Sequence, residues 1–374
     1  WLTPVEIFCP WYSQAIGAWI AQQAHGHSGR LRVVEIGGGT GTNALCLLDW
    51  ARSNAPSLYE RMSYSIVEVS EPLADLQARR LTAHGDRVRV VYGDATDAAA
   101  LAEAHGGSPE DHAFVLALEV CDNMPHDKVV LRLSPEGEEE LLEAVVVGPE
   151  NEEQLRPAED ELVLDAVESS GLLQVLRKDL RDRQKQDLFS QLANKLGAVF
   201  GGRSSCDVET TAAFVPTTAL AFLRAVRTAI PNHTLFLADF DDFPPADLSW
   251  CTPEQLRESP LRARNAPLVS SRDVHGENRD HPTYAVEHGT ADIMWAVDFP
   301  AYVYMYKKTM GSAARTCRFD QSRAFLEQYA NMTATRTLSG YNPLLEDFTN
   351  TSILRASSSP PATNTEREVP SALR

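Results

Sequence analysis

Residues 31–41 read LRVVEIGGGTG, an apolar run that passes directly into four glycines. The run 31–36 predicts a short strand, and 42–51 has the pattern of a helix. Glycine adopts a positive φ readily and lets a ligand approach the backbone where other residues carry a Cβ. A helix that begins at such a loop presents unpaired N–H groups and the positive end of its dipole. This strand, loop and helix therefore predict a binding site for an anionic group.

The rest of the chain continues the alternation of strands and helices. Strands are predicted at 64–69, 88–92, 113–120 and 234–239, helices at 72–84, 217–228 and 301–310, and a strand, loop and strand at 284–299. Alternation of this kind implies crossover connections and a mainly parallel sheet. We therefore predict an α/β fold: a doubly wound, mainly parallel sheet with helices on both faces and an inserted cap region.

The inserted cap is predicted where the alternation breaks. Residues 128–133 and 141–147 have the pattern of a strand pair, and highly charged stretches follow them. Segments of this length between regular elements are usually functional insertions. The predicted segments are a helical lead-in (1–27), a cofactor-binding half (28–127), the insertion (128–202), a second half of the domain (203–310), a C-terminal helical extension (311–356) and a disordered tail (357–374).

The spacing of the glycines indicates which ligand the loop binds. Glu35, Gly37, Gly39 and Gly41 form an ExGxGxG pattern, whereas a dinucleotide-binding loop would read GxGxxG and need a glycine in place of Thr42. We therefore expect S-adenosylmethionine, with its methionine carboxylate at the start of the helix, rather than a nicotinamide cofactor.

Two further acidic residues fit the same cofactor. Glu68 lies at the carboxyl end of the second predicted strand, and Asp94 follows the third. Ligands of doubly wound sheets bind outside the carboxyl ends of the strands. Glu68 could accept hydrogen bonds from both ribose hydroxyls, and Asp94 could accept one from the adenine amine. For either residue alone, the alternative is a solvated surface carboxylate.

The composition excludes several classes of protein. The chain carries 52 acidic and 34 basic residues, a formal net charge of -18, which argues against a nucleic-acid binder. Solubility explains this charge, and attraction of a basic protein substrate is the alternative. No apolar run approaches the roughly 20 residues of a membrane span. The six cysteines are scattered without a CxxC pair, so neither a metal site nor a disulfide framework is predicted.

Several motifs occur in an order typical of one enzyme family. They are TPVEI at 3–7, EIGGGTGT at 35–42, LEVCDNMP at 118–125, LFLADF at 235–240, GTAD at 289–292 and VDF at 297–299. In these motifs the chain resembles the class I S-adenosylmethionine methyltransferases. More narrowly, it resembles the MidA-like family, which includes mitochondrial protein arginine methyltransferases that assist the assembly of respiratory complex I. The resemblance implies a mitochondrial location and, as partner, a protein with an accessible arginine, such as a complex I subunit.

The resemblance also implies where the acceptor binds. Glu119 and Asp122 lie at the end of the fourth predicted strand, where carboxylates could hold a guanidinium and accept its proton, so we predict them to be catalytic. Asn123 and Asp239 are predicted to contact the substrate, as is Glu6, which belongs to the N-terminal motif.

Alternatives remain open at this point. Asp122 could simply cap a turn, and His126 is expected to be a surface loop residue rather than a base. The aromatic N-terminal segment, with Trp11 and Tyr12, is expected to pack on the core, although it could instead close over the cofactor. The motif departs from the family at Leu118 and Cys121, which motivates a small-molecule acceptor as an alternative. The divergent insertion motivates a non-enzymatic assembly factor.

Overall fold

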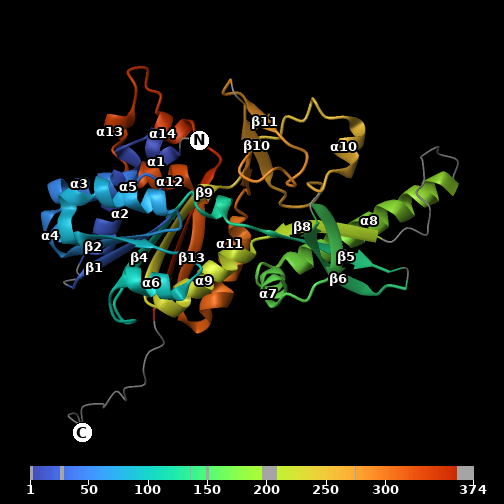
Figure 1. Cartoon of the computed structure of the whole chain (residues 1–374), viewed down its shortest axis with the longest axis horizontal. Helices are drawn as coiled ribbons and strands as arrows, with labels where there is room; N and C mark the ends of the chain where they lie inside the picture. Colours follow the sequence, from blue (N-terminus) through green and yellow to red (C-terminus); the bar gives the residue numbers. More distant parts are fainter. Residues whose placement is uncertain are drawn as a thin grey trace, which may run out of the picture.

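The computed structural model describes residues 3–25, 29–134, 136–148, 151–195, 209–273 and 275–359. A seven-stranded sheet forms its centre, with the order β13-β14-β9-β4-β1-β2-β3 (Figure 1). The strands are β1 (Leu31–Ile36), β2 (Met62–Glu68), β3 (Val88–Tyr92), β4 (Ala113–Leu118), β9 (His233–Phe240), β13 (Ala314–Gln321) and β14 (Thr351–Ser358).

Five neighbouring strands, β3, β2, β1, β4 and β9, run parallel, while β14 is antiparallel to both β9 and β13. All six residues of β1 are buried, which is why this strand is apolar throughout rather than alternating. The predicted doubly wound α/β fold is thereby confirmed.

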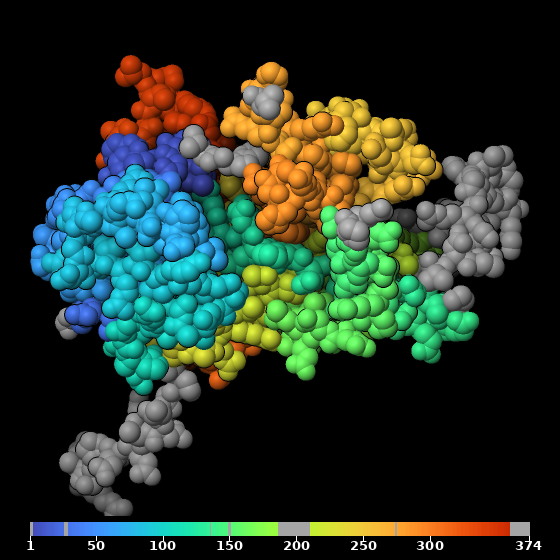
Figure 2. Space-filling model, viewed as in Figure 1, coloured from blue at the N-terminus to red at the C-terminus, as the bar shows by residue number. Residues whose placement is uncertain are grey.

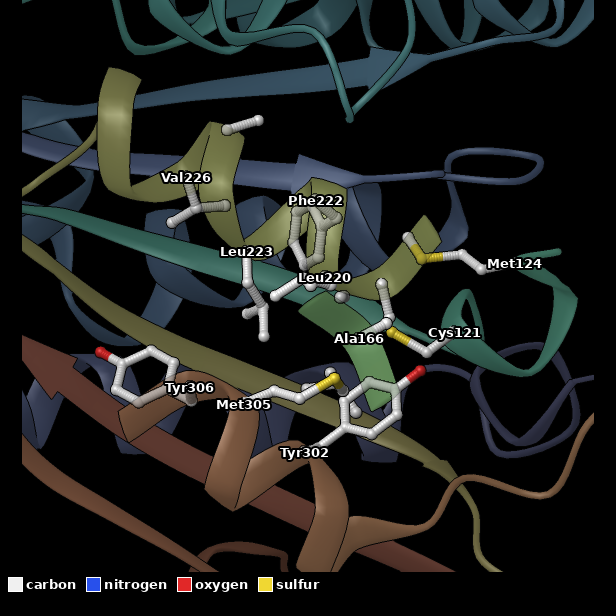
Figure 3. Close-up of a cluster of buried hydrophobic side chains, with 14 of the residues drawn as sticks. Cys121, Met124, Ala166, Leu220, Phe222, Leu223, Val226, Tyr302, Met305 and Tyr306 are labelled. Carbon is white, nitrogen blue, oxygen red and sulfur yellow. The ribbon is translucent and has the colours of Figure 1, made fainter. Parts of the chain in front are cut away.

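Helices cover both faces of the sheet. One face packs against α1 (Pro4–Ile7), α2 (Trp11–Gln23), α3 (Thr42–Asn54) and α12 (Ser322–Tyr329), and the other against α6 (Ala98–His105), α9 (Thr217–Ala229) and α11 (Phe299–Met310) (Figure 1). The hydrophobic core between the sheet and the second group of helices includes Leu220, Phe222 and Met305 (Figure 3). The remaining helical segments near the sheet are α4 (Pro56–Arg61), α5 (Glu71–Arg80), η1 (Thr82–Arg87), η3 (Gly311–Ala313), α13 (Met332–Thr335) and α14 (Pro343–Glu346).

The strand order creates a switch point between β1 and β4. From β1 the chain proceeds outward to β2 and β3, and it then returns to β4 on the other side of β1. Loops that leave the carboxyl ends of β1 and β4 therefore diverge, and a crevice between such loops is where doubly wound sheets bind their ligands.

An inserted lobe follows β4 and the short turn η2 (Cys121–Asn123). It contains the antiparallel sheet β7-β6-β5-β8, which projects away from the main sheet (Figures 1 and 2). Its elements are β5 (Asp127–Leu133), β6 (Glu139–Val147), β7 (Glu152–Pro157), α7 (Glu161–Ser169), α8 (Leu172–Lys195) and β8 (Glu209–Val215). The predicted strand pair is confirmed as β5 and β6, but the lobe extends beyond the predicted boundary at 202, because β8 pairs with β5.

A second, smaller insertion lies between β9 and α11. It contains α10 (Pro253–Glu258) and a three-stranded sheet of β10 (Leu268–Arg272), β11 (Asn278–Asp280) and β12 (Asp292–Met294). Only β12 falls within the stretch 284–299, so the first of the two strands predicted there is wrong. None of the helices in the described residues combines the length and apolar character that crossing a membrane requires.

The segment 311–356, predicted to be a helical extension, contains the helices α12, α13 and α14 but also two strands that were not predicted. This segment contributes β13 and β14 to the central sheet, and β14 lies between β9 and β13. Six of the eight positions in β14, TSILRASS, are buried, and three of these six are Ser or Thr. Small polar side chains in a buried strand hid its character from a hydrophobicity pattern. The predicted tail also begins too early, since Ser357 and Ser358 belong to β14, and 360–374 lie outside the described residues.

Candidate active site

The glycine loop, residues 37–41, joins β1 to α3 and needs its glycines. Gly37, Gly39 and Gly41 have φ values of +61°, +52° and +82°, a region that other residues adopt only with strain. A Cβ on Gly37 would lie 3.1 Å from Val120 Cγ2, whereas a Cβ on Gly39 would meet nothing within 4 Å. The loop therefore presents bare backbone to open space at Gly39, at the start of α3.

Glu35 supports this loop from behind. Its side chain is buried, and its two oxygens accept hydrogen bonds from Asn43 Nδ2 at 2.8 Å and from the Tyr64 hydroxyl at 2.9 Å. Burial raises the pKa of Glu35 to about 7, although both donors lower it. Both oxygens are engaged inside the protein, so Glu35 ties the end of β1 to α3, and its predicted contact with the cofactor stays a prediction.

A single side chain, that of Gln77, connects Glu68 to the glycine loop. The buried Gln77 donates through Nε2 both to Glu68 Oε2 at 2.9 Å and to the carbonyl of Gly39 at 2.8 Å. The other oxygen, Oε1, accepts from the Ser70 N–H at 3.0 Å. Gln77 thus holds the loop and the end of β2 together, as a shared adenosyl ligand would require.

Asp94 follows β3 at the same edge of the sheet. The N–H of its neighbour Gly93 donates to the carbonyl of Glu68 at 2.9 Å, which brings the two strand ends together. The Asp94 side chain is exposed, and its Oδ1 accepts from the N–H and the hydroxyl of Thr96. The Asp94 carboxylate is therefore open to solvent at this edge of the sheet. Its predicted contact with the adenine amine stays a prediction.

The N-terminal segment docks on the glycine loop. The Glu6 carboxylate accepts from the hydroxyls of Thr40 and Thr42, the latter at 2.8 Å. Arg80 Nη1 donates to the same two hydroxyls, at 2.8 and 2.9 Å. Glu6 therefore contacts the loop itself in this structure, and its predicted contact with the substrate stays a prediction.

Three carboxylates gather at the ends of β4 and β9, and we call Glu119, Asp122 and Asp239 the acid cluster. Asp239 Oδ2 accepts from the N–H groups of Cys121 at 2.9 Å and Asp122 at 3.3 Å, so the turn after β4 closes on the end of β9. Asp122 and Asp239 are buried, and Glu119 is half-buried with an unusual φ of +54°. Such a backbone conformation in a non-glycine residue is typical of functional sites.

The surroundings of the acid cluster favour the protonated forms of its three carboxyl groups. Burial, followed by the charge of Asp122, raises the pKa of Glu119 to about 8. Burial raises the pKa of Asp122 to about 6, and burial and the Asp122 charge raise the pKa of Asp239 well above its usual range. Perturbed groups of this kind concentrate at functional sites. A cation bound among the three carboxylates would relieve both the repulsion and the cost of desolvation.

Two predicted neighbours of the cluster differ in their surroundings. Asn123 is exposed and donates through Nδ2 to Asp122 Oδ1 at 2.7 Å, so it orients that carboxylate. His126 is not the solvated loop histidine that we expected. Its ring stacks on Trp295 with centroids 4.7 Å apart, and burial lowers its pKa to about 4. An imidazole with a lowered pKa is a weak base, so His126, stacked on Trp295, is suited to holding this loop rather than to accepting a proton.

Two tyrosines lie at the acid cluster, and the sequence did not point to the second of them, Tyr302. Tyr12 of α2 is buried, and the charges of Glu119 and Asp239 add to burial in raising its pKa. Tyr302 of α11 is also buried, and its hydroxyl points toward Cys121 (Figure 3). The N-terminal aromatic residues were expected to pack on the core, with closure over the cofactor as the alternative, and nothing in the local pattern of α11 indicates that Tyr302 reaches the end of β4.

The sequence of residues 15–317 matches a family described as putative S-adenosyl-L-methionine-dependent methyltransferase. None of the curated proteins matches the sequence with significant similarity.

Among solved structures, the chain is similar to a COG1565 superfamily member from Burkholderia thailandensis bound to S-adenosyl-homocysteine. That match has a TM-score of 0.56 and 18% identity, and it covers 96% of this chain and 78% of the other. An uncharacterized ACR protein of the same superfamily and organism matches with a TM-score of 0.54 and 18% identity, covering 95% of this chain and 81% of the other. At this identity the likeness supports the fold. Because the family match covers most of the chain, the protein belongs to the family of putative S-adenosyl-L-methionine-dependent methyltransferases, and the prediction of S-adenosylmethionine as its cofactor is confirmed.

Proposed function

We propose that the protein transfers the methyl group of S-adenosylmethionine to an arginine side chain of a protein substrate. The observation that carries the proposal is the acid cluster, three carboxylates at the end of β4, which neighbours β1, and at the end of β9, which neighbours β4. A guanidinium is always cationic and presents a planar fork of donors, which carboxylates can bind in a bidentate manner. The family resemblance extends the proposal to a subunit of respiratory complex I as the acceptor and to a mitochondrial location.

The cofactor supplies a methyl group on a positively charged sulfur, and the residues of this chain fit its binding. The backbone at Gly39 is bare and open, Gly41 caps α3, and Glu68 is held beside the loop by Gln77. We assign the methionine carboxylate to the glycine loop and the amino end of α3, and the ribose hydroxyls to Glu68.

The acid cluster would position the acceptor and take its proton. As a guanidinium binds, its charge lowers the pKa values that burial and mutual repulsion have raised, so the carboxylates become ionised on binding. Asp122 and Asp239 would hold the cation, with Asp239 itself fixed by three backbone N–H groups. When a guanidinium nitrogen forms its bond to carbon, one N–H proton must leave, and we assign its acceptor to the Glu119 carboxylate. A positioned base of this kind contributes typically 10²–10⁴-fold to the rate.

A hollow beyond the end of β9 supports a basic peptide rather than a free small molecule as the acceptor. A cavity of about 280 Å³ opens just beyond the end of β9, and Asp241, Asp298 and the ring of Phe319 are among the residues that line it. Two carboxylates and an exposed aromatic ring in the lining of this cavity suit a further cationic side chain of the same substrate.

The test is methyl transfer to an arginine-rich protein with label in the methyl group of S-adenosylmethionine. We expect methylarginine after hydrolysis of the acceptor. Glu119→Gln should lower the rate at least 100-fold while S-adenosyl-homocysteine still binds, and Glu103→Gln, which changes an exposed acid on α6, should leave the rate unchanged. Label found only on small molecules, or no label on any arginine of complex I subunits or other basic proteins, would overturn the proposal.

A further inference from the structure

Two cysteine side chains from distant parts of the chain meet beside the glycine loop. Cys9 Sγ and Cys46 Sγ lie 3.1 Å apart, although 37 positions separate the residues in sequence. Cys9 lies in the turn between α1 and α2 and is exposed, whereas Cys46 is buried on α3. Neither is bonded to another cysteine.

The two cysteines belong to the N-terminal segment, which contacts the glycine loop through Glu6, and to α3, which begins at that loop. Cys9 is three residues beyond Glu6, whose carboxylate binds the hydroxyls of Thr40 and Thr42. Cys46 is four residues beyond Thr42, one turn further along α3. A covalent bond between the sulfurs would therefore fasten the N-terminal segment to the helix that begins at the glycine loop.

We propose that Cys9 and Cys46 are a redox-active pair, which a small-molecule disulfide such as glutathione disulfide converts into an intramolecular disulfide. The sulfurs need to approach by only about 1 Å to reach the S–S bond length of about 2.05 Å. The pairing depends on no property of the methyl acceptor, so it stands or falls separately from the proposed transfer to arginine.

The two cysteines take different parts in the reaction. Exposed Cys9 is the sulfur that an oxidant can reach, so its thiolate attacks one sulfur of glutathione disulfide and expels the first glutathione thiolate. Cys46 then loses its proton, attacks the Cys9 sulfur and expels the second. Two protein thiols and one glutathione disulfide thus become one protein disulfide and two glutathione thiols.

The surroundings of Cys46 disfavour it as the sulfur that attacks first. Its burial, together with the neighbouring Cys9, raises its pKa to about 12, so it stays protonated in the resting protein, and the nearby Arg80 acts in the opposite sense. Cys46 is buried, whereas Cys9, which lies against it, is exposed, so an oxidant meets Cys9 first. The order of the two steps follows from this arrangement.

The test uses the full chain, treated with glutathione disulfide in its native state. The number of titratable thiols should fall from the six that the sequence contains to four. Trypsin digestion without reduction should then yield one new species, in which the peptide 1–30, with Cys9, is joined to the peptide 33–52, with Cys46. Cys9→Ser and Cys46→Ser should each abolish this species, and Cys317→Ser should leave it unchanged. In Cys46→Ser, glutathione should stay attached to Cys9.

A second measurement tests the structural consequence. In the oxidised protein, amide hydrogen exchange in residues 3–9 should slow relative to the reduced protein, while exchange in α9 stays the same. The proposal is overturned if six thiols persist in the folded protein under excess glutathione disulfide. Joining of a different pair of cysteines, or formation of the 1–30 to 33–52 species only after unfolding in urea, would overturn it as well.

Discussion

Replacement of Gly39 by alanine should separate the cost of strain from the loss of a ligand. Gly39 has φ +52° and space for a methyl group, because an added Cβ would meet nothing within 4 Å. Gly106, the C-cap of α6, has φ +58°, and an added Cβ would meet only the Glu103 carbonyl oxygen, at 3.6 Å. Alanine in a left-handed conformation costs about 1–2 kcal/mol, so each variant should lower the free energy of unfolding by that amount.

Only Gly39→Ala should weaken binding of the cofactor. The open space beside Gly39 is where the glycine loop would meet the cofactor, whereas Gly106 precedes β4 and so lies at the opposite edge of the parallel sheet. We expect the affinity for S-adenosyl-homocysteine to fall at least about tenfold in Gly39→Ala, about 1.4 kcal/mol, and to stay unchanged in Gly106→Ala. Urea unfolding and titration calorimetry measure the two quantities. Equal affinities in the two variants would refute the assignment of the loop.

Three further predictions concern buried acids. The kcat/KM for an arginine substrate should rise with pH between about 6 and 8, because the carboxylates with raised pKa values ionise in this range. Asp122→Asn should move the midpoint of this rise to lower pH, because the Asp122 charge raises the pKa of Glu119. A midpoint that does not move in Asp122→Asn would contradict this. Tyr64→Phe should lower the free energy of unfolding by about 1–3 kcal/mol, since Glu35 loses a donor, whereas exposed Tyr92→Phe should be neutral in urea unfolding. Asp239→Asn should cost about 1–3 kcal/mol in the same assay, because one oxygen that accepts backbone N–H groups becomes a donor; an unchanged midpoint would refute this.

The cofactor half of the site was predictable because its parts lie close together in sequence. A strand, a glycine loop and a helix follow one another from Leu31 to Asn54, and local patterns report such units well. Glu68 and Asp94 were found as the acids that end the next two strands. The hydrogen bonds of Glu35 were not predictable, because its partners Asn43 and Tyr64 lie on different elements and no local pattern brings them together.

The end of the chain was the least predictable part of the fold. A strand such as β14 is defined by its pairing with β9, over 100 residues earlier. Its buried Thr351, Ser352 and Ser358 are tolerated inside because their hydroxyls donate to the carbonyl of Phe348, the carboxylate of Asp241 and the carbonyl of Pro231. The same dependence on distant partners explains why Tyr302 could not be assigned to the acid cluster.

By itself, the amino-acid sequence determined the α/β class, the glycine loop and its preference for an adenosyl ligand, since these depend on neighbours within a few dozen residues. Only the tertiary structure decided which side chains share one environment: Asp239 beneath the turn at Cys121, 118 positions away, and Cys9 against Cys46. Packing of the sheet and its helices sets these contacts. The burial that results, and not the type of residue, shifts the protonation of the three acids.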